Sequence, residues 1–538
     1  MSSPLISILL PTYNTDPVWL REAVDSVLMQ VYPYWELCIA DDASTDGRVR
    51  DILSSYAVNE PRIKLCFRST NGHISEASNS ALEMATGDWV ALMDHDDILP
   101  PNALEEVAKL ILDNLDSRLI YSDEDKIDEH GKRFDPYFKS DWNRDLFYSH
   151  NMISHLGVYH LETVRKIGGF RKGFEGSQDH DLALRFIEQI RDDQIHHIPK
   201  ILYHWRSHSE STASTGNAKP YALTAGERGI NDHLKRTGSR GSCTRDGAGG
   251  YRVRYPMPER RLVVSAIIIS NGNTKNLLRC VDQIKKAPGS IDWDFRVFPS
   301  TPKVGRLLRT AGLPPETLLE ERREEETLSV FLNRVARNAS GELLWYLHEQ
   351  MGELDEGGVE EMVSHALRSE IGAVGGKQFY PDGRVRQAGL LLDYKRISRP
   401  SFHHWNGDSR GYMGRLTLIQ NYSAVSIDCL MIEKMKFLEV GGFDEGHLKS
   451  HHLDVDLCLR LKEAGYRTLW TPYARFCDSR PRFSPSGIMK QFSYAFRQDT
   501  AYMKGRWGAL LRNDSAYNPN LNQKNKDFNY RWPPKENE

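Results

Sequence analysis

This sequence has few of the features that mark membrane-spanning, disulfide-bonded or nucleic-acid-binding proteins. Its seven cysteines are odd in number and include no Cys-x-x-Cys pair, which argues against a disulfide framework and a zinc module. No run approaches the ~18 apolar residues that cross a bilayer, and the first residues lack a basic stretch followed by an apolar core. With 70 basic and 73 acidic residues, the chain has no positive excess for a nucleic-acid partner. We expect a cytoplasmic protein with at most peripheral contact at the inner membrane.

What the chain does have is an alternation of short apolar runs and amphipathic helical patterns. Residues 5–10 have the length and composition of a strand, and a helical pattern through Leu20, Val24 and Val27 follows. A second strand is predicted over residues 35–40. This alternation indicates a mostly parallel, doubly wound sheet, whose ligand crevice lies at the carboxyl ends of the strands. The loops at Tyr13, Asp42 and Asp96 should therefore converge.

The most distinctive motif is Asp94-His95-Asp96-Asp97, which ends the apolar run of residues 89–93. Carboxylate oxygens at a strand end suit Mg²⁺ or Mn²⁺, and such a cation neutralises a diphosphate. A solvated acidic turn is the usual explanation of an isolated Asp-x-Asp pair. Because the motif Asp94-His95-Asp96-Asp97 is expected beside two other polar loops, we favour a cation site here.

In order and spacing, residues 5 to about 215 resemble a family 2 glycosyltransferase with the nucleotide-diphospho-sugar transferase (GT-A) fold. The resemblance implies that the loop after the first strand and the acidic turn after the second hold the base and ribose of the donor. Asn71, Gly72 and Asn79 also fall where the family has similar residues. The donor-binding positions are Pro11, Tyr13, Asp41, Asp42 and Asp94, and the metal motif falls on Asp94, Asp96 and Asp97, without settling which carboxylate contacts metal or ribose.

The same resemblance places a general base at Asp179, after Gly168-Gly169-Phe170 and at the start of the motif of residues 176–185. A hydroxyl that attacks an anomeric carbon needs a carboxylate to accept its proton, whereas the departing nucleoside diphosphate needs a metal. One base and one cation suffice for inversion. The alternative is that Asp179 caps the helix, with Asp181 in its first turn.

After the predicted strand at residues 198–202, the resemblance implies a metal-ligating histidine at His208 and a phosphate-facing arginine at Arg206. His204 is equally well explained as a structural histidine and is left out of the site. The implied cofactor is Mn²⁺ or Mg²⁺. The implied partners are a UDP- or dTDP-linked sugar donor and a glycan or lipid-linked glycan acceptor.

A glycine-rich stretch at residues 238–260, the predicted linker, is followed by a repeat of the opening pattern. Residues 263–269 form another apolar run, and Gly341, Gly442 and Asp454 follow at nearly the spacings of Gly87, Gly169 and Asp179. We predict an α/β protein of two tandem GT-A domains, over residues 1–237 and 261–490. Residues 491–538 are predicted to form a C-terminal helix, packed on the second domain, and a tail.

The second copy has lost the acidic motifs of the first. Pro299-Ser300 replaces Asp41-Asp42, and residues 348–351 replace the acidic motif with His-Glu-Gln-Met, so that only Asp454 survives. We therefore interpret it as a pseudo-transferase that shapes the acceptor groove or mediates assembly. The two-domain pattern resembles transferases of bacterial surface polysaccharides, O-antigen or capsule, with rhamnose among the plausible sugars. A bifunctional transferase and a non-catalytic sugar-binding or scaffolding protein remain open, and a metal-dependent hydrolase is disfavoured.

Overall fold

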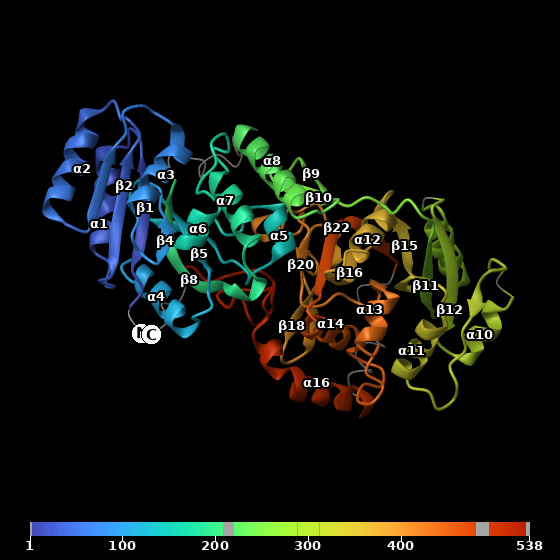
Figure 1. Cartoon of the computed structure of the whole chain (residues 1–538). Helices are drawn as coiled ribbons and strands as arrows, with labels where there is room; N and C mark the ends of the chain where they lie inside the picture. Colours follow the sequence, from blue (N-terminus) through green and yellow to red (C-terminus); the bar gives the residue numbers. More distant parts are fainter. Residues whose placement is uncertain (1–2, 208–219, 288, 311, 480–493, 534–538) are drawn as a thin grey trace. The chain divides into compact units, whose positions relative to one another are not determined.

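The computed structural model describes residues 3–207, 220–287, 289–310, 312–479 and 494–533. The chain divides into two compact units: the first comprises Met1–Trp142 and Phe147–Val253, and the second comprises Asn143–Leu146 and Arg254–Glu538. Each unit is built on one large sheet with helices packed against it (Figure 1). In the described part of the chain, no helix combines the length and apolar character needed to cross a membrane.

The sheet of the first unit has eight strands in the order β3-β2-β1-β4-β7-β5-β6, with β8 paired to β5. Strands β1 to β4 are parallel neighbours, whereas β7 runs antiparallel between β4 and β5. The strands are β1 (Ile6–Thr12), β2 (Trp35–Asp41), β3 (Ile63–Phe67), β4 (Trp89–Leu92), β5 (Leu119–Ile127), β6 (Arg133–Tyr137), β7 (Gly157–His160) and β8 (Ile195–Arg206).

Helices cover this sheet because their apolar faces match its buried strands. In α1, Asp16 accepts a hydrogen bond from the Val18 amide and Pro17 occupies the first turn, so the helix begins where the sequence predicts. Its buried face packs with the side chains of β1 and β2 in one core. The helices are α1 (Pro17–Leu28), α2 (Gly47–Asn59), α3 (His73–Met84), α4 (Ala103–Asp113), α5 (Arg144–Ser149), α6 (Leu161–Lys166), α7 (Gln178–Ile187) and α8 (Pro220–Arg236).

The sheet of the second unit repeats this topology, in the order β13-β12-β11-β14-β21-β16-β22-β15. Strands β12, β11 and β14 are parallel, β21 is antiparallel between β14 and β16, and β22 is parallel to β16, as β8 is to β5. The strands of this sheet are β11 (Leu262–Ser270), β12 (Ile291–Pro299), β13 (Leu318–Leu319), β14 (Leu343–His348), β15 (Met351–Leu354), β16 (Ile371–Phe379), β17 (Val385–Gln387), β20 (Gln420–Asn421), β21 (Cys429–Glu433) and β22 (Arg467–Asp478); β18 (Leu390–Asp393) and β19 (Ile397–Pro400) pair separately. The predicted α/β class with a tandem repeat is confirmed.

Matched contacts show that the repeat extends to single residues. The Gly87 amide donates to Ser7 Oγ at 3.0 Å, and the Gly341 amide donates to Ser265 Oγ at 2.9 Å. A Cβ atom at Gly87 would lie 2.5 Å from the Leu5 carbonyl oxygen, so the close approach of backbone to strand requires glycine. The same local geometry therefore survives in both copies.

The boundary between the two units falls within the predicted linker, after Val253, and much of residues 238–260 forms a hairpin of β9 (Ser242–Arg245) and β10 (Tyr251–Arg254). Asn231 on α8 bonds both the amide and the carbonyl of Cys243 at 2.9 and 3.0 Å. Gly247 and Gly249 have positive φ in the connecting turn. Glycine here serves a tight turn rather than a flexible connection.

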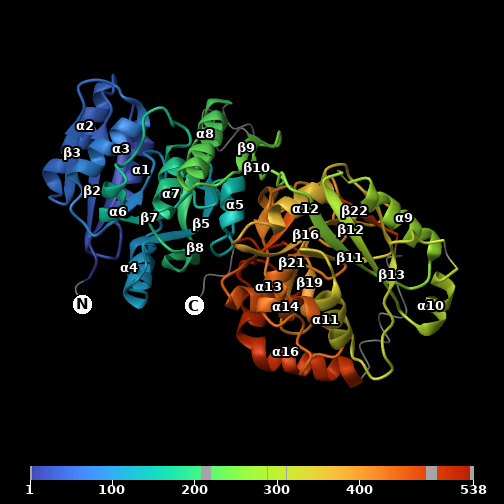
Figure 2. The ribbon, with the colours of Figure 1, turned by 45° about the vertical axis from the view of Figure 1, so that its right-hand side comes forward.

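The helices of the second unit are α9 (Thr274–Lys285), α10 (Pro302–Leu308), α11 (Leu328–Asn338), α12 (Gly358–Ala366), α13 (Lys434–Glu439), α14 (Leu453–Glu463) and α16 (Tyr494–Arg512). Figure 2 shows α16 lying beside α14. The Trp507 indole donates to Asp456 Oδ1 at 2.9 Å, and Met503 and Trp507 are buried. The aromatic residues of α16 thus pack within the second unit.

Candidate active site

Three loops of the first unit meet at the carboxyl ends of β1, β2 and β4, as the alternation of strands and helices predicts. Asn14 Oδ1 accepts from the Thr45 amide at 2.8 Å, which joins the first loop to the second. Thr15 Oγ1 lies 2.8 Å from His95 Nδ1, which joins the first loop to the acidic motif. These contacts hold the three loops together at one edge of the sheet.

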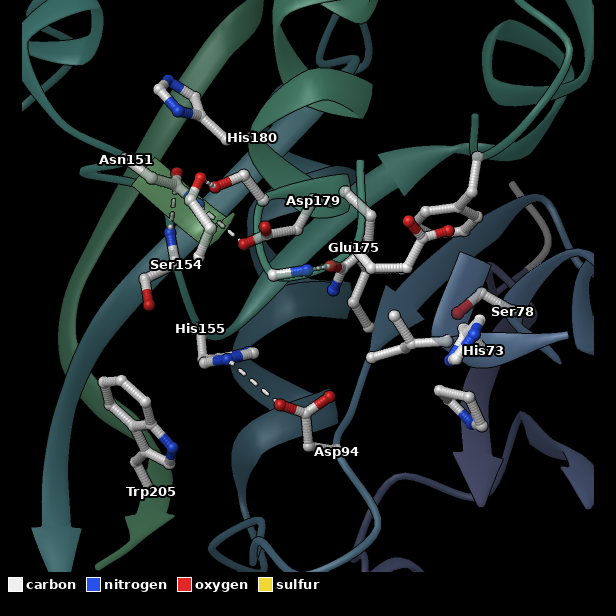
Figure 3. Close-up of a pocket in the computed structure, with 18 of the residues that line it drawn as sticks. His73, Ser78, Asp94, Asn151, Ser154, His155, Glu175, Asp179, His180 and Trp205 are labelled. Atoms are coloured by element: carbon white, nitrogen blue, oxygen red, sulfur yellow. Dashed lines mark hydrogen bonds and ion pairs between the residues drawn. The ribbon is translucent and has the colours of Figure 1, made fainter. Parts of the chain in front are cut away.

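A cavity with a volume of about 670 Å³ lies wholly within the first unit. His73 and Ser78 line one part, and Asp94, His155 and Asp179 line another (Figure 3). Pro11 is also a lining residue. Tyr221 of α8 and Tyr251 of the hairpin also contribute to its wall. The segment predicted to be a linker thus supplies part of the site.

Asp94 faces a histidine that sequence reasoning did not select. His155 Nε2 lies 3.7 Å from Asp94 Oδ2, and Figure 3 shows the two side chains pointing toward one another. One potential ligand atom from each of Asp94, Asp97 and His155 lies within 4.8 Å of the others. His155 Nδ1 is buried without a hydrogen-bond partner. The donor set of carboxylates and an imidazole nitrogen fits Mn²⁺ or Mg²⁺.

Asp97 is fully buried and connects the acidic motif to β8. Its carboxylate accepts from the Tyr203 hydroxyl at 2.5 Å and from the Arg206 amide at 2.7 Å. Burial, together with the charges of Asp96 and Asp94, raises the pKa of Asp97 well above its usual range. Because both oxygens already accept hydrogen bonds, Asp97 orients the motif against β8.

Asp179 lies in the first turn of α7 and accepts from Asn151 Nδ2 at 2.6 Å. The residue before this helix, Ser177, occupies the cap position, so Asp179 is not the N-cap. Burial raises the pKa of Asp179, and the neighbouring His155 partly opposes that rise. A carboxylate with a raised pKa, held at the wall of a cavity, is suited to accept a proton.

Asp181, two residues further along α7, has a structural role. Arg185 Nε donates to its carboxylate at 2.9 Å, and the Arg185 guanidinium also reaches the carbonyls of Ile167 and Gly169. Arg171 forms a second ion pair with Asp181. The two carboxylates of this motif therefore separate into one that faces the cavity and one that fixes the preceding turn.

The donor-binding candidates are differently placed. Pro11 lines the cavity, while Tyr13 is 44% exposed. The buried carboxylate of Asp42 accepts a hydrogen bond from the Gly72 amide and forms an ion pair with Arg68 at 2.8 Å. Asp41 Oδ2 accepts from the Ser44 amide at 3.1 Å, but Asp41 Oδ1 is buried without a partner. An unmet buried acceptor is costly, so Asp41 is the carboxylate with capacity for a ligand donor.

The remaining predicted residues do not all reach the cavity wall. Arg206 is buried, with its guanidinium 2.5 Å from Glu22 Oε2 and 2.7 Å from the Asp96 carbonyl oxygen, and it is absent from the lining residues. Its predicted role of facing a phosphate stays a prediction, because Arg206 here pairs with Glu22, whose side chain is 46% exposed. Asp96 is half-buried in the acidic turn. His208 lies outside the described residues.

Asn151 and His155 were missed because their signal in the sequence is weak. They belong to the segment of residues 151–155, in which Met152 and Ile153 are buried and the polar side chains line the cavity. This pattern directly precedes β7 and carries no recognisable motif. Asn79, which falls where the family has a similar residue, exchanges two hydrogen bonds with the backbone of Phe170 at 2.8 and 2.9 Å.

In the second unit, strand register places His348 and Met351 where the first unit has Asp94 and Asp97. Glu349, fully buried, takes the position of His95 and accepts from the Asn271 amide at 2.9 Å and from Ser270 Oγ. Asp454 accepts from the Ile427 amide at 3.1 Å. The Glu349 carboxylate thus binds the loop that follows β11.

Comparisons with known proteins place the chain among glycosyltransferases. A model of glycosyl transferase family 2 matches residues 7–168. An uncharacterized protein, y4gI, of Sinorhizobium fredii (strain NBRC 101917 / NGR234) is 40% identical over 98% of the chain, and the O-antigen biosynthesis protein RfbC of Myxococcus xanthus is 32% identical over 99% of it. The chain covers 58% and 42% of these two proteins, about half of their length. The putative glycosyltransferase EpsE of Bacillus subtilis (strain 168) is 31% identical over 35% of the chain and 68% of its own length.

Proposed function

Because the chain belongs to glycosyl transferase family 2, we propose that its first unit moves a sugar from a UDP- or dTDP-linked donor to a glycan or lipid-linked glycan acceptor, with inversion. The observation that carries this proposal is a single cavity containing both the Asp94–His155 pair and Asp179. A relative named for O-antigen biosynthesis supports a role in bacterial polysaccharide synthesis. Rhamnosyl transfer is one form that we propose for it from the sequence resemblance. The proposed location is the cytoplasm, with peripheral contact at the inner membrane.

In the proposed reaction, Asp179 accepts the proton of the attacking hydroxyl. The bond between that oxygen and the anomeric carbon forms as the bond to the diphosphate breaks, so the configuration inverts. Burial raises the pKa of Asp179 and makes its carboxylate a stronger base than an exposed aspartate. Asn151 Nδ2, 2.6 Å from Oδ2, orients the carboxylate.

A divalent cation, Mn²⁺ or Mg²⁺, would neutralise the charge that develops on the departing diphosphate. Asp94 and His155 are the described side chains best placed to hold it, with Asp97 behind them. Asp96 and His208 remain ligands predicted from the sequence. At the donor end, the unpartnered Asp41 Oδ1 would accept an N–H of the base, and Tyr13 would cover it.

The test is a thermal-shift panel of UDP, dTDP, GDP and CDP on the full chain, with and without Mn²⁺. A ligand that binds only the native state raises the unfolding temperature by mass action. We expect at least one nucleotide to stabilise the wild type in a Mn²⁺-dependent way and to lose that dependence in Asp94→Asn. A panel in which no nucleotide shifts the transition would contradict the proposal.

We further propose that the second unit is a pseudo-transferase that shapes the acceptor groove or mediates assembly. The substitution of His348 and Met351 for Asp94 and Asp97, and the commitment of Glu349 to hydrogen bonds, support this. Asp454→Asn should leave the linkage and rate of transfer nearly unchanged. A wild type that forms two distinct linkages, one of which Asp454→Asn deletes, would instead identify a bifunctional enzyme.

A further inference from the structure

The segment of residues 151–155 is attached to the interior of the first unit through one buried lysine. Lys139 is 1% exposed, and its ammonium donates to the carbonyl oxygens of Ile153 and His155, both at 2.6 Å. Its third partner is Glu124 Oε2, at 3.0 Å. The same Glu124 oxygen accepts from the His155 amide at 2.9 Å. The three ammonium donors are thus matched to three acceptors.

These bonds determine which way the segment faces. Since the carbonyls of Ile153 and His155 point inward to the ammonium, the side chains of Asn151, Ser154 and His155 face the cavity, as Figure 3 shows. Asn151 there contacts Asp179, and His155 contacts Asp94. One short segment thus connects the proposed base with the proposed cation ligands.

We propose that Lys139, together with Glu124, is a positioning residue. It orients the Asn151 side chain toward Asp179 and the His155 side chain toward Asp94. This proposal rests on the proposed function, because it concerns the same cavity. Lys139 does not touch the cavity and acts through the segment alone. A buried ion pair is poor support for stability, since removing two charges from water costs about as much as their attraction returns. Positioning is therefore the better explanation for its presence.

The second unit offers a contrast. Strand register aligns His155 with Asp428. In that unit the Ile427 amide bonds Asp454, and Arg386 reaches Asp428 at 3.3 Å. Different groups therefore hold the corresponding segment of the second unit, namely Asp454 and Arg386. The contacts of Lys139 with this segment thus occur in the unit that keeps the acidic motif.

The second unit also provides a matched control. Lys436 is buried as well, and its ammonium donates to the carbonyls of Arg368 and Ile371 at 2.6 and 2.9 Å and pairs with Glu433 at 2.9 Å. Lys436→Met therefore removes a comparable buried ammonium far from the segment in sequence. Its effect on the first unit measures only a general loss of stability.

The experiment compares Lys139→Met, the double variant Lys139→Met/Glu124→Leu and Lys436→Met in the full chain. Mn²⁺ binding is followed by calorimetry and by the electron paramagnetic resonance of Mn²⁺. We expect Lys139→Met to weaken Mn²⁺ binding about 10–100-fold, as loss of groups that orient metal ligands commonly does. The double variant should regain thermal stability, because no unpaired charge remains, but not Mn²⁺ affinity. Lys436→Met should bind Mn²⁺ as the wild type does.

A second measurement does not depend on the cation. Amide hydrogen exchange of the peptide covering residues 150–156 should be faster in Lys139→Met and unchanged in Lys436→Met. Wild-type Mn²⁺ affinity in folded Lys139→Met, or recovery of affinity together with stability in the double variant, would overturn the proposal. A wild type that binds no Mn²⁺ would refute the cation site of the proposed function. Unchanged amide hydrogen exchange in Lys139→Met would refute the positioning role of Lys139.

Discussion

The side-chain amide of Asn151 donates to Asp179 across 2.6 Å, joining the segment before β7 to the first turn of α7. Burial raises the pKa of Asp179, and the neighbouring His155 opposes that rise. A hydrogen bond from an amide also favours the charged form of a carboxylate. The contact with Asn151 orients the Oδ2 atom of Asp179, a side chain that lines the cavity. The chemistry proposed for Asp179 thus depends on a residue 28 positions earlier in the chain.

Asp179→Asn should retain nucleotide binding and lose turnover. An amide cannot accept the proton of the attacking hydroxyl, and general-base catalysis commonly contributes about 10²–10⁴-fold. Calorimetry with the best nucleotide and initial rates with a defined acceptor would separate the two effects. Asp454→Asn, the same substitution in the other copy, is the matched control. Near wild-type turnover in Asp179→Asn would assign the base to another residue.

Asn151→Ala should move the acidic limb of the pH–rate profile to higher pH. Asp179 must be ionised to act as a base, so the rate falls as pH falls through its pKa. Burial already raises that pKa, and loss of the hydrogen bond to the carboxylate should raise it further. The profile of kcat/KM for the two proteins provides the measurement. A limb that stays in place would show that Asn151 has no influence on the titrating group.

His155→Ala and His208→Ala distinguish two possible ligand sets. His155 lies 3.7 Å from Asp94, whereas the assignment of His208 rests on the sequence alone. Because a divalent cation has few protein ligands here, we expect loss of His155 to weaken Mn²⁺ binding at least about tenfold. Calorimetric titration of both variants with Mn²⁺ gives the comparison. Wild-type affinity in His155→Ala together with weak binding in His208→Ala would favour the ligand set predicted from the sequence.

Asn79→Ala and Asn333→Ala should destabilise the two units through the same lost contacts. Each amide exchanges two hydrogen bonds with a phenylalanine backbone, Asn79 with Phe170 and Asn333 with Phe443. Leaving such buried groups unpaired costs about 1–3 kcal/mol. Urea unfolding followed by circular dichroism would measure both losses, and UDP affinity should stay unchanged. Loss of nucleotide binding in Asn79→Ala without loss of stability would contradict a purely structural role of Asn79.

Much of the fold could be predicted because it depends on local patterns. The apolar runs at residues 5–10 and 263–269 became β1 and β11, and the matched spacing of Gly87 and Gly341 reflects the same close backbone approach in both copies. The glycine-rich segment at residues 238–260 contains the boundary between the two units, but its composition did not reveal that part of it forms a hairpin. Its hairpin forms through contacts with Asn231, which no local pattern reveals.

The sequence by itself determined the tandem α/β organisation, the acidic motif at Asp94 and the motif around Asp179, because strand periodicity and motif order are properties of neighbouring residues. Only the tertiary structure decided which polar side chains meet. It brought His155 to Asp94 and Asn151 to Asp179, turned Arg206 toward Glu22, and left Asp41 Oδ1 without a partner. The physical reason is that hydrogen bonds and ion pairs form between groups that the packing of the sheet makes neighbours, irrespective of their separation along the chain.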